Sequence, residues 1–142
     1  MQNSKVIKWM FWPLLVICLV QTLWIFLSWS WRPDPNMVLS ATPVGEGGAI
    51  YEVLYDSGGA TGAYVYRYFV MERQPSEEAL FEKTRKAKPF LVTKMPGAVR
   101  EVVGTSVKLR TRDTIYDFHN VASFKVGEQL TIVTFDLDAT GP

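Results

Sequence analysis

The single histidine of the chain follows an aspartate by two residues, and this pair can do chemistry. Asp117 and His119 fall in the segment 114–119, whose pattern predicts a strand, so both side chains point to one face. An aspartate that orients a histidine is part of the catalytic triad of hydrolases. No serine stands in a Gly-x-Ser-x-Gly context, however, and no cysteine is available. The sequence therefore favours an exposed polar face, with Tyr116 and Phe118 buried on the other side.

A second pair of acids lies in the segment 134–141, which reads Thr-Phe-Asp-Leu-Asp-Ala-Thr-Gly. It resembles the nucleophile motif of haloacid-dehalogenase-type phosphatases. The resemblance implies that Asp136 attacks phosphorus and that Asp138 is the acid/base, beside Mg²⁺. That family normally has glycine where Ala139 stands, and it needs a lysine and more metal-binding acids in a long region after the motif, whereas this sequence ends at Pro142. We therefore expect an ordinary strand whose acids face water.

Three basic residues alternate along one predicted strand: Lys108, Arg110 and Arg112. On one strand face they form a stripe that can bind an anionic partner, a lipid headgroup or a phosphate. The alternative is cross-strand charge pairing, including pairing with Asp136 and Asp138 if those strands are neighbours. Pairing is favoured, and the stripe is also the first candidate for partner binding.

Tyrosines form the other candidate surface for a partner. Tyr64, Tyr66 and Tyr68 share one strand face by the two-residue period, and Tyr51 and Tyr55 lie on the facing strand. Together they predict a large aromatic surface of the kind found in interface cores. The same face can instead pack on the helix that follows in the chain, and core packing is favoured.

Composition excludes several classes of function. One histidine, with no cysteine outside the apolar segment, argues against a zinc site. Residues 33–142 carry 12 basic and 14 acidic side chains, which gives no electrostatic case for binding nucleic acid. We therefore predict a protein that is not an enzyme and has no catalytic residues, cofactor or metal.

These residues follow an apolar segment that predicts a transmembrane helix over 9–30. Residues 9–28 carry no charge, and at about 1.5 Å per residue they span the ~30 Å hydrocarbon core. The five tryptophans fall at its two ends, as in aromatic belts. Lys5 and Lys8 precede it, so residues 1–8 are expected in the cytoplasm and the domain outside. A signal peptide cleaved near Ser30 is the alternative.

The rest of the chain predicts an α+β fold. Residues 31–48 are expected to be a linker, because three prolines and three glycines exclude a continuous helix. Residues 49–142 then form the extracytoplasmic domain, with a hairpin over 49–71 and one short helix that starts after the N-cap Ser76. Six further strands follow from Phe90 onward, which predicts an antiparallel sheet of about six or seven strands.

Short motifs around the predicted hairpin resemble a group of small, largely uncharacterised bacterial envelope proteins. They are Ser-Gly-Gly-Ala-Thr at 57–61, Tyr-Val-Tyr-Arg at 64–67 and Pro-Phe-Leu-Val-Thr at 89–93. That group similarly carries a Gly-Gly-Ala-Thr turn between two strands behind an N-terminal membrane segment. The resemblance implies a bacterial inner-membrane anchor and a periplasmic domain, and it implies no catalytic residues.

The sequence thus predicts a single-pass, non-catalytic module whose domain binds an envelope or secreted protein. Immunity to a secreted toxin and exclusion of a competing phage fit such a module. Two alternatives stay open. One is an envelope hydrolase that uses Asp117 and His119, or Asp136 and Asp138. The other is a structural subunit of a membrane complex.

Overall fold

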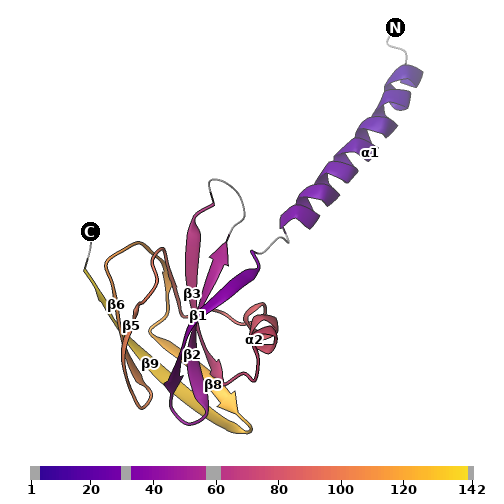
Figure 1. The fold of residues 1–142 in the computed structure, drawn as a ribbon. Helices are drawn as coiled ribbons and strands as arrows, with labels where there is room; N and C mark the ends of the chain where they lie inside the picture. The colour runs from indigo at the N-terminus through magenta and orange to yellow at the C-terminus, as the bar shows by residue number, and fades with distance from the viewer. Residues whose placement is uncertain (1–3, 30–32, 57–61, 141–142) are drawn as a thin grey trace. The chain divides into compact units, whose positions relative to one another are not determined.

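The structure is a computed structural model that describes residues 4–29, 33–56 and 62–140. The chain divides into two compact units, residues 1–32 and residues 33–142. The described residues of the first unit form one helix, and those of the second form a domain of two β-sheets and a short helix (Figure 1). The fold class is therefore α+β, as the sequence predicted.

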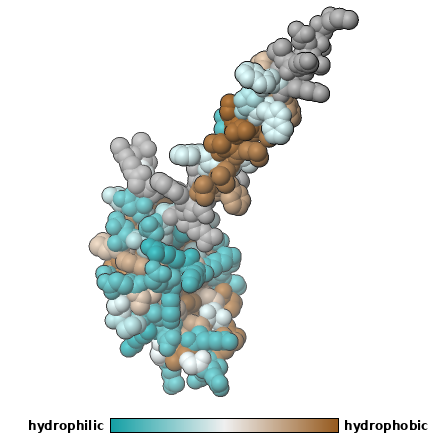
Figure 2. Space-filling view, turned by 90° about the vertical axis from the view of Figure 1, so that its right-hand side faces the viewer, coloured by the Kyte–Doolittle hydropathy of each residue, from teal (hydrophilic) through white to brown (hydrophobic). Residues whose placement is uncertain are grey.

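Helix α1 runs from Ser4 to Trp29 and is long and apolar enough to cross a membrane between Trp9 and Leu27. Its apolar side chains surround the helix axis, whereas the visible face of the domain is mostly hydrophilic (Figure 2). The Thr22 hydroxyl donates to the Cys18 carbonyl at 2.7 Å, so this polar side chain is satisfied within its own helix.

The first sheet, sheet A, is antiparallel throughout and has the strand order β1-β2-β3-β4-β7. Strands β2 and β3 form the predicted hairpin, in continuous register from the Gly48–Glu72 pair to the Asp56–Tyr64 pair. The bounds of the five strands are β1 Pro35–Val44, β2 Gly48–Asp56, β3 Tyr64–Glu72, β4 Leu91–Thr93 and β7 Ile115–Phe118.

The predicted linker over 31–48 is wrong for most of its length, because Pro35–Val44 is strand β1. The strand tolerates proline since it lies at the edge of sheet A, where one row of N–H groups has no ladder partner. Pro35 is the first residue of β1, and register shifts occur between Pro35 and Met37 and between Val38 and Ser40. The prolines therefore restrict β1 to an edge rather than preventing a strand.

The second sheet, sheet B, has the order β5-β6-β9-β8 and is mixed, because β6 and β9 run parallel. The single sheet of six or seven strands expected from sequence is thus wrong, because the described residues form nine strands in two sheets. The strand pairing is mainly antiparallel, as predicted. The bounds in sheet B are β5 Val99–Val103, β6 Ser106–Thr111, β8 Val121–Val126 and β9 Gln129–Ala139.

Two apolar cores hold the domain together. The larger core lies between the sheets, where Phe90 and Phe135 stack with ring centroids 3.8 Å apart. The smaller core lies on the other face of sheet A, where Leu80 of helix α2 (Glu77–Thr84) packs on residues such as Tyr51 and Phe69. The Ser76 hydroxyl accepts the Ala79 N–H at 3.2 Å and caps α2 as predicted. Sheet A is thus the middle layer of the domain.

Candidate functional site

The predicted basic stripe lies on the outer face of sheet B. Lys108, Arg110 and Arg112 are exposed, and the residues between them point into the core. Lys108 Nζ lies 2.8 Å from Glu101 Oε2 on β5. This hydrogen bond raises the pKa of Lys108, with a smaller contribution from the charge of Asp136.

The neighbouring strand pairs the stripe with acids. Because β6 and β9 are parallel and adjacent, Lys108 lies opposite Asp136 and Arg110 lies opposite Asp138. Arg110 Nε is 3.3 Å from Asp138 Oδ2. The alternative of cross-strand charge pairing is therefore confirmed for these two basic residues. Asp138 thus pairs with Arg110, whereas the ion-pair partner of Lys108 is Glu101 rather than Asp136.

A fourth basic residue, Arg100, joins the stripe, and the sequence analysis missed it. Strand β5 has a register shift between Val99 and Glu101, so Arg100 is an extra residue in the ladder. A bulge of this kind redirects a side chain, and here Arg100 and Glu101 are both exposed. The signal in the sequence was two consecutive charges inside an otherwise apolar strand.

Together these side chains line a hollow of about 540 Å³, which we call the arginine hollow. Its lining residues are Arg100, Lys108, Leu109, Arg110, Arg112 and Asp138. In the part of the chain that the structure describes, Arg100 and Arg112 have no ion pair or side-chain hydrogen bond. Two positive charges in the arginine hollow are thus without an acidic partner there.

The tyrosine surface predicted from sequence does not form. Tyr68 is fully buried in the larger core, and Tyr66 packs against that core, so only Tyr64 is largely exposed, at 55%. The β2–β3 register places Glu52, not a tyrosine, opposite Tyr68. Tyr51, which was expected on the same surface, lies in the smaller core on the opposite face of sheet A. Core packing, the favoured alternative, is what the structure shows, but Tyr66 and Tyr68 pack in the core between the sheets and not on helix α2 as expected.

Tyr68 instead belongs to a buried polar network centred on Glu52, which is 5% exposed. The Glu52 carboxylate accepts the Tyr68 hydroxyl at 2.9 Å, the Ser40 hydroxyl at 3.1 Å and the Gly97 N–H at 2.7 Å. The Tyr68 oxygen also accepts the Ala98 N–H at 3.2 Å. The network fastens three strands of sheet A to the turn before β5.

The aspartate–histidine pair is present, with Asp117 Oδ2 and His119 Nε2 3.5 Å apart. His119 lines a hollow of about 250 Å³ with Lys88, Pro89, Phe90, Val121 and Ala122. None of these lining residues has a hydroxyl or thiol that the histidine can activate. Tyr116 is 53% exposed, so the prediction that it is buried behind the pair is wrong. The described residues also contain no group of three or more His, Cys, Asp or Glu placed to hold a metal ion.

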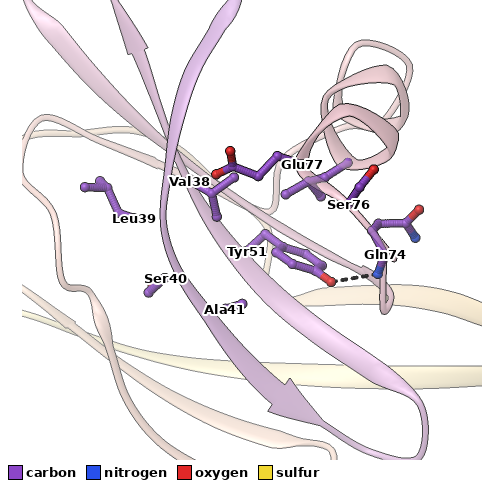
Figure 3. A pocket seen from close by; sticks show the side chains of 9 residues that line it. Val38, Leu39, Ser40, Ala41, Tyr51, Gln74, Ser76 and Glu77 are labelled. Carbon is purple, nitrogen blue, oxygen red and sulfur yellow. Dashed lines mark hydrogen bonds between the residues drawn. The ribbon is translucent and has the colours of Figure 1, made fainter.

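A further hollow, of about 390 Å³, lies between strand β1 and helix α2, and we call it the β1 groove (Figure 3). One wall is a continuous run of β1, residues 38–41, and the other is formed by Gln74, Ser76, Glu77 and Leu80. Tyr51 lies between the walls, and its hydroxyl accepts the Gln74 N–H at 2.8 Å (Figure 3). Sequence reasoning missed this site because it assigned β1 to a linker.

The Gly-Gly-Ala-Thr turn, at 58–61, lies outside the described residues. No protein-family model, curated protein or solved structure matches the chain.

Proposed function

We propose that this protein is a single-pass, membrane-anchored binding module without catalytic activity. Helix α1 is the anchor, residues 1–8 face the cytoplasm, and the domain faces the periplasm of a bacterium. The domain binds an envelope or secreted protein, and the partner adds a strand to the free edge of β1. The observation that carries the proposal is that β1 is a long edge strand without a charged residue.

Strand β1 differs from the other edge strands in the described sheets. It has 10 residues, whereas β5, β7 and β8 have 5, 4 and 6. Each of those three contains at least one charged residue, and β1 contains none. Soluble proteins protect exposed edges with charges, bulges and proline, because an open edge pairs with other chains. Strand β1 has prolines and register shifts but no charge, so the uncharged stretch between the second shift and Pro43 is suited to receive a strand.

The β1 groove gives specificity to such an edge. Pro43 has no N–H, so its nitrogen faces away from β2, and Ala41, two residues earlier, presents its N–H and C=O on the same free side. An added strand can bond to Ala41 and place every second side chain toward the groove. Pro43 and the two register shifts limit this pairing to the central part of β1. Backbone hydrogen bonds would supply affinity, and the groove would select side chains.

Photo-crosslinking from the full-length protein in its native cells tests the strand-addition site. A benzophenone amino acid at Leu39, which is 40% exposed and lines the β1 groove, should give one discrete adduct. Ala41→Pro should weaken this adduct about tenfold, because it removes an edge N–H and leaves the β1–β2 ladder intact. Met37→Lys, which adds a protecting charge to the exposed edge of β1, should act in the same direction.

The matched control for this experiment is Ile132, which is 57% exposed on sheet B. The same adduct from Ile132, or an adduct that survives both edge variants, would contradict strand addition at β1.

The identity of the captured protein then distinguishes the proposed roles. A secreted toxin supports immunity, a phage component supports exclusion, and a resident complex supports a structural subunit.

The anchor has its own test, because a cleaved signal sequence also forms an apolar N-terminal helix. We expect the protein in the membrane fraction to keep its full mass of 16.1 kDa. We also expect added protease to digest the domain only from the periplasmic side. A mass that lacks the first 30 residues would show cleavage. Lys5→Glu with Lys8→Glu should increase the fraction with inverted orientation, because these lysines set the positive side.

A further inference from the structure

The arginine hollow contains more hydrogen-bond donors than its own acids can use. Asp138 contacts Arg110 through Nε, and no partner within the described residues is seen for the two terminal nitrogens of that guanidinium. Arg100 and Arg112 line the same hollow without an acidic partner in those residues. A guanidinium carries five N–H donors, so most of the donor capacity in the hollow is free.

The fold builds this concentration of charge in two ways. The bulge in β5 adds Arg100 to the exposed face of the sheet, beside strand β6, which carries Lys108 and Arg110 and ends one residue before Arg112. The ion pair with Asp138 lies on the Nε side of Arg110, which leaves the paired terminal N–H groups available. Planar guanidinium groups match the oxygens of phosphate, and two parallel hydrogen bonds to one phosphate are common.

We propose that the arginine hollow is a binding site for a phosphate group, carried by an anionic lipid headgroup or by a free phosphate ester. Arg100 and Arg112 supply the unpaired charge, and Arg110 supplies an oriented pair of donors. Lys108, which Glu101 holds at 2.8 Å, forms the wall of the site. The site lies on sheet B, on different residues from the β1 groove, so it is a second binding function.

The first arm of the test uses inorganic phosphate and the full-length protein in non-ionic maltoside micelles. The Nε–H signals of Arg100, Arg110 and Arg112 are followed by NMR at constant ionic strength, each assigned from its own Arg→Lys variant. All three should shift with phosphate. Arg100→Gln with Arg112→Gln should weaken binding about tenfold or more, because both remove charged hydrogen bonds.

The second arm places the full-length protein in nanodiscs of phosphatidylglycerol or of phosphatidylcholine, each doped with a headgroup spin label. A lipid-binding site should show broadened arginine signals with phosphatidylglycerol and not with phosphatidylcholine. A site for free phosphate esters should respond only in the first arm. Either response supports the proposal if it depends on Arg100 and Arg112.

The matched control is Lys125→Gln, which removes an exposed charge from β8 of the same sheet, outside the arginine hollow. If this variant weakens both responses as much as the arginine variants do, the effect is general electrostatics and the proposal is wrong. It is also wrong if the arginine signals move in neither arm. Arg100 and Arg112 are exposed, so their variants should keep the fold, and the circular dichroism spectrum checks this.

Discussion

At the scale of the residue, the buried carboxylate of Glu52 is central to the domain. A buried charge is tolerated when its oxygens receive hydrogen bonds, and Glu52 receives them from two hydroxyls and a backbone N–H. Tyr68 is the key donor, because its oxygen also accepts a backbone N–H from Ala98. Removing this one hydroxyl therefore leaves the buried Ala98 N–H without its partner and takes one of three hydrogen bonds from Glu52.

Tyr68→Phe should lower the free energy of unfolding by about 1–3 kcal/mol. Burial raises the pKa of Tyr68 above its ordinary value, and the charge of Glu52 adds to this. The folded state then keeps a proton that the unfolded state loses above about pH 10, so stability should fall as pH rises beyond that point. Tyr68→Phe should flatten this alkaline fall. Urea unfolding followed by tyrosine circular dichroism, at pH 8 to 11, measures both effects.

The control for this prediction is Tyr64→Phe, because Tyr64 is exposed and lies on the same strand. It should change neither the stability at neutral pH nor the alkaline fall. An alkaline slope that stays unchanged in Tyr68→Phe would mean that the titrating group lies elsewhere.

The sequence allowed part of the candidate site to be predicted at this scale. Alternation placed Lys108 and Arg110 on one exposed face correctly, since the two-residue period of a strand is local information. It did not predict Arg100, because a bulge depends on pairing with another strand. Alternation also predicted an exposed tyrosine surface, whereas Tyr66 and Tyr68 face the core between the sheets. Periodicity showed which residues share a face but not which face of sheet A receives sheet B.

At the scale of the element, sheet A and sheet B meet where Gly48 faces Phe124. A Cβ atom at Gly48 would overlap the Phe124 ring. The ring of Phe124, on β8, therefore occupies the space that the missing side chain of Gly48 leaves open on β2. Gly48 is the first residue of β2, and Phe124 lies in the middle of β8. Phe124 is 5% exposed in the core between the sheets. The distance between the sheets thus depends on an absent side chain.

Gly48→Ala should destabilise the domain by about 1–3 kcal/mol, because the methyl group overpacks this contact. Phe124→Leu should partly relieve the overlap, so the double variant should lose less stability than the two single changes together. Denaturant unfolding of the four proteins in the cycle gives the coupling. Strict additivity would show that Gly48 is needed for its backbone rather than for the space it leaves.

Elements were predicted well where their signals are local. Helix α2 and its cap followed from Ser76, and the six strands predicted from Phe90 onward are β4 to β9. Strand β1 was missed because prolines also mark linkers, and only its pairing with β2 identifies it as an edge. The parallel pairing of β6 with β9 joins segments that are distant in sequence. The pattern of residues within one strand does not indicate which other strand it pairs with.

At the scale of the whole molecule, the two units differ in their aromatic residues. All five tryptophans lie between residues 9 and 31, and all six tyrosines lie between residues 51 and 116. Both apolar cores are formed within residues 38–137. Tryptophan therefore reports on the first unit and tyrosine on the second.

We expect urea to unfold the domain of the full-length protein in micelles while α1 stays helical. The near-ultraviolet circular dichroism of tyrosine should be lost in one transition, and tryptophan emission should stay nearly constant, because detergent continues to cover the apolar helix. Coincident transitions of the two signals would contradict independent units.

The central position of β9 in sheet B also determines the order in which the domain can be assembled. Strand β9 lies between β6 and β8, yet it is the last of the four strands to be synthesised. Before it emerges, the β5–β6 hairpin and β8 cannot join, and Val133 and Phe135 are missing from the larger core. The apolar face of sheet A then lacks part of its cover. The nascent domain is thus exposed to aggregation and to chaperones until one late strand completes it.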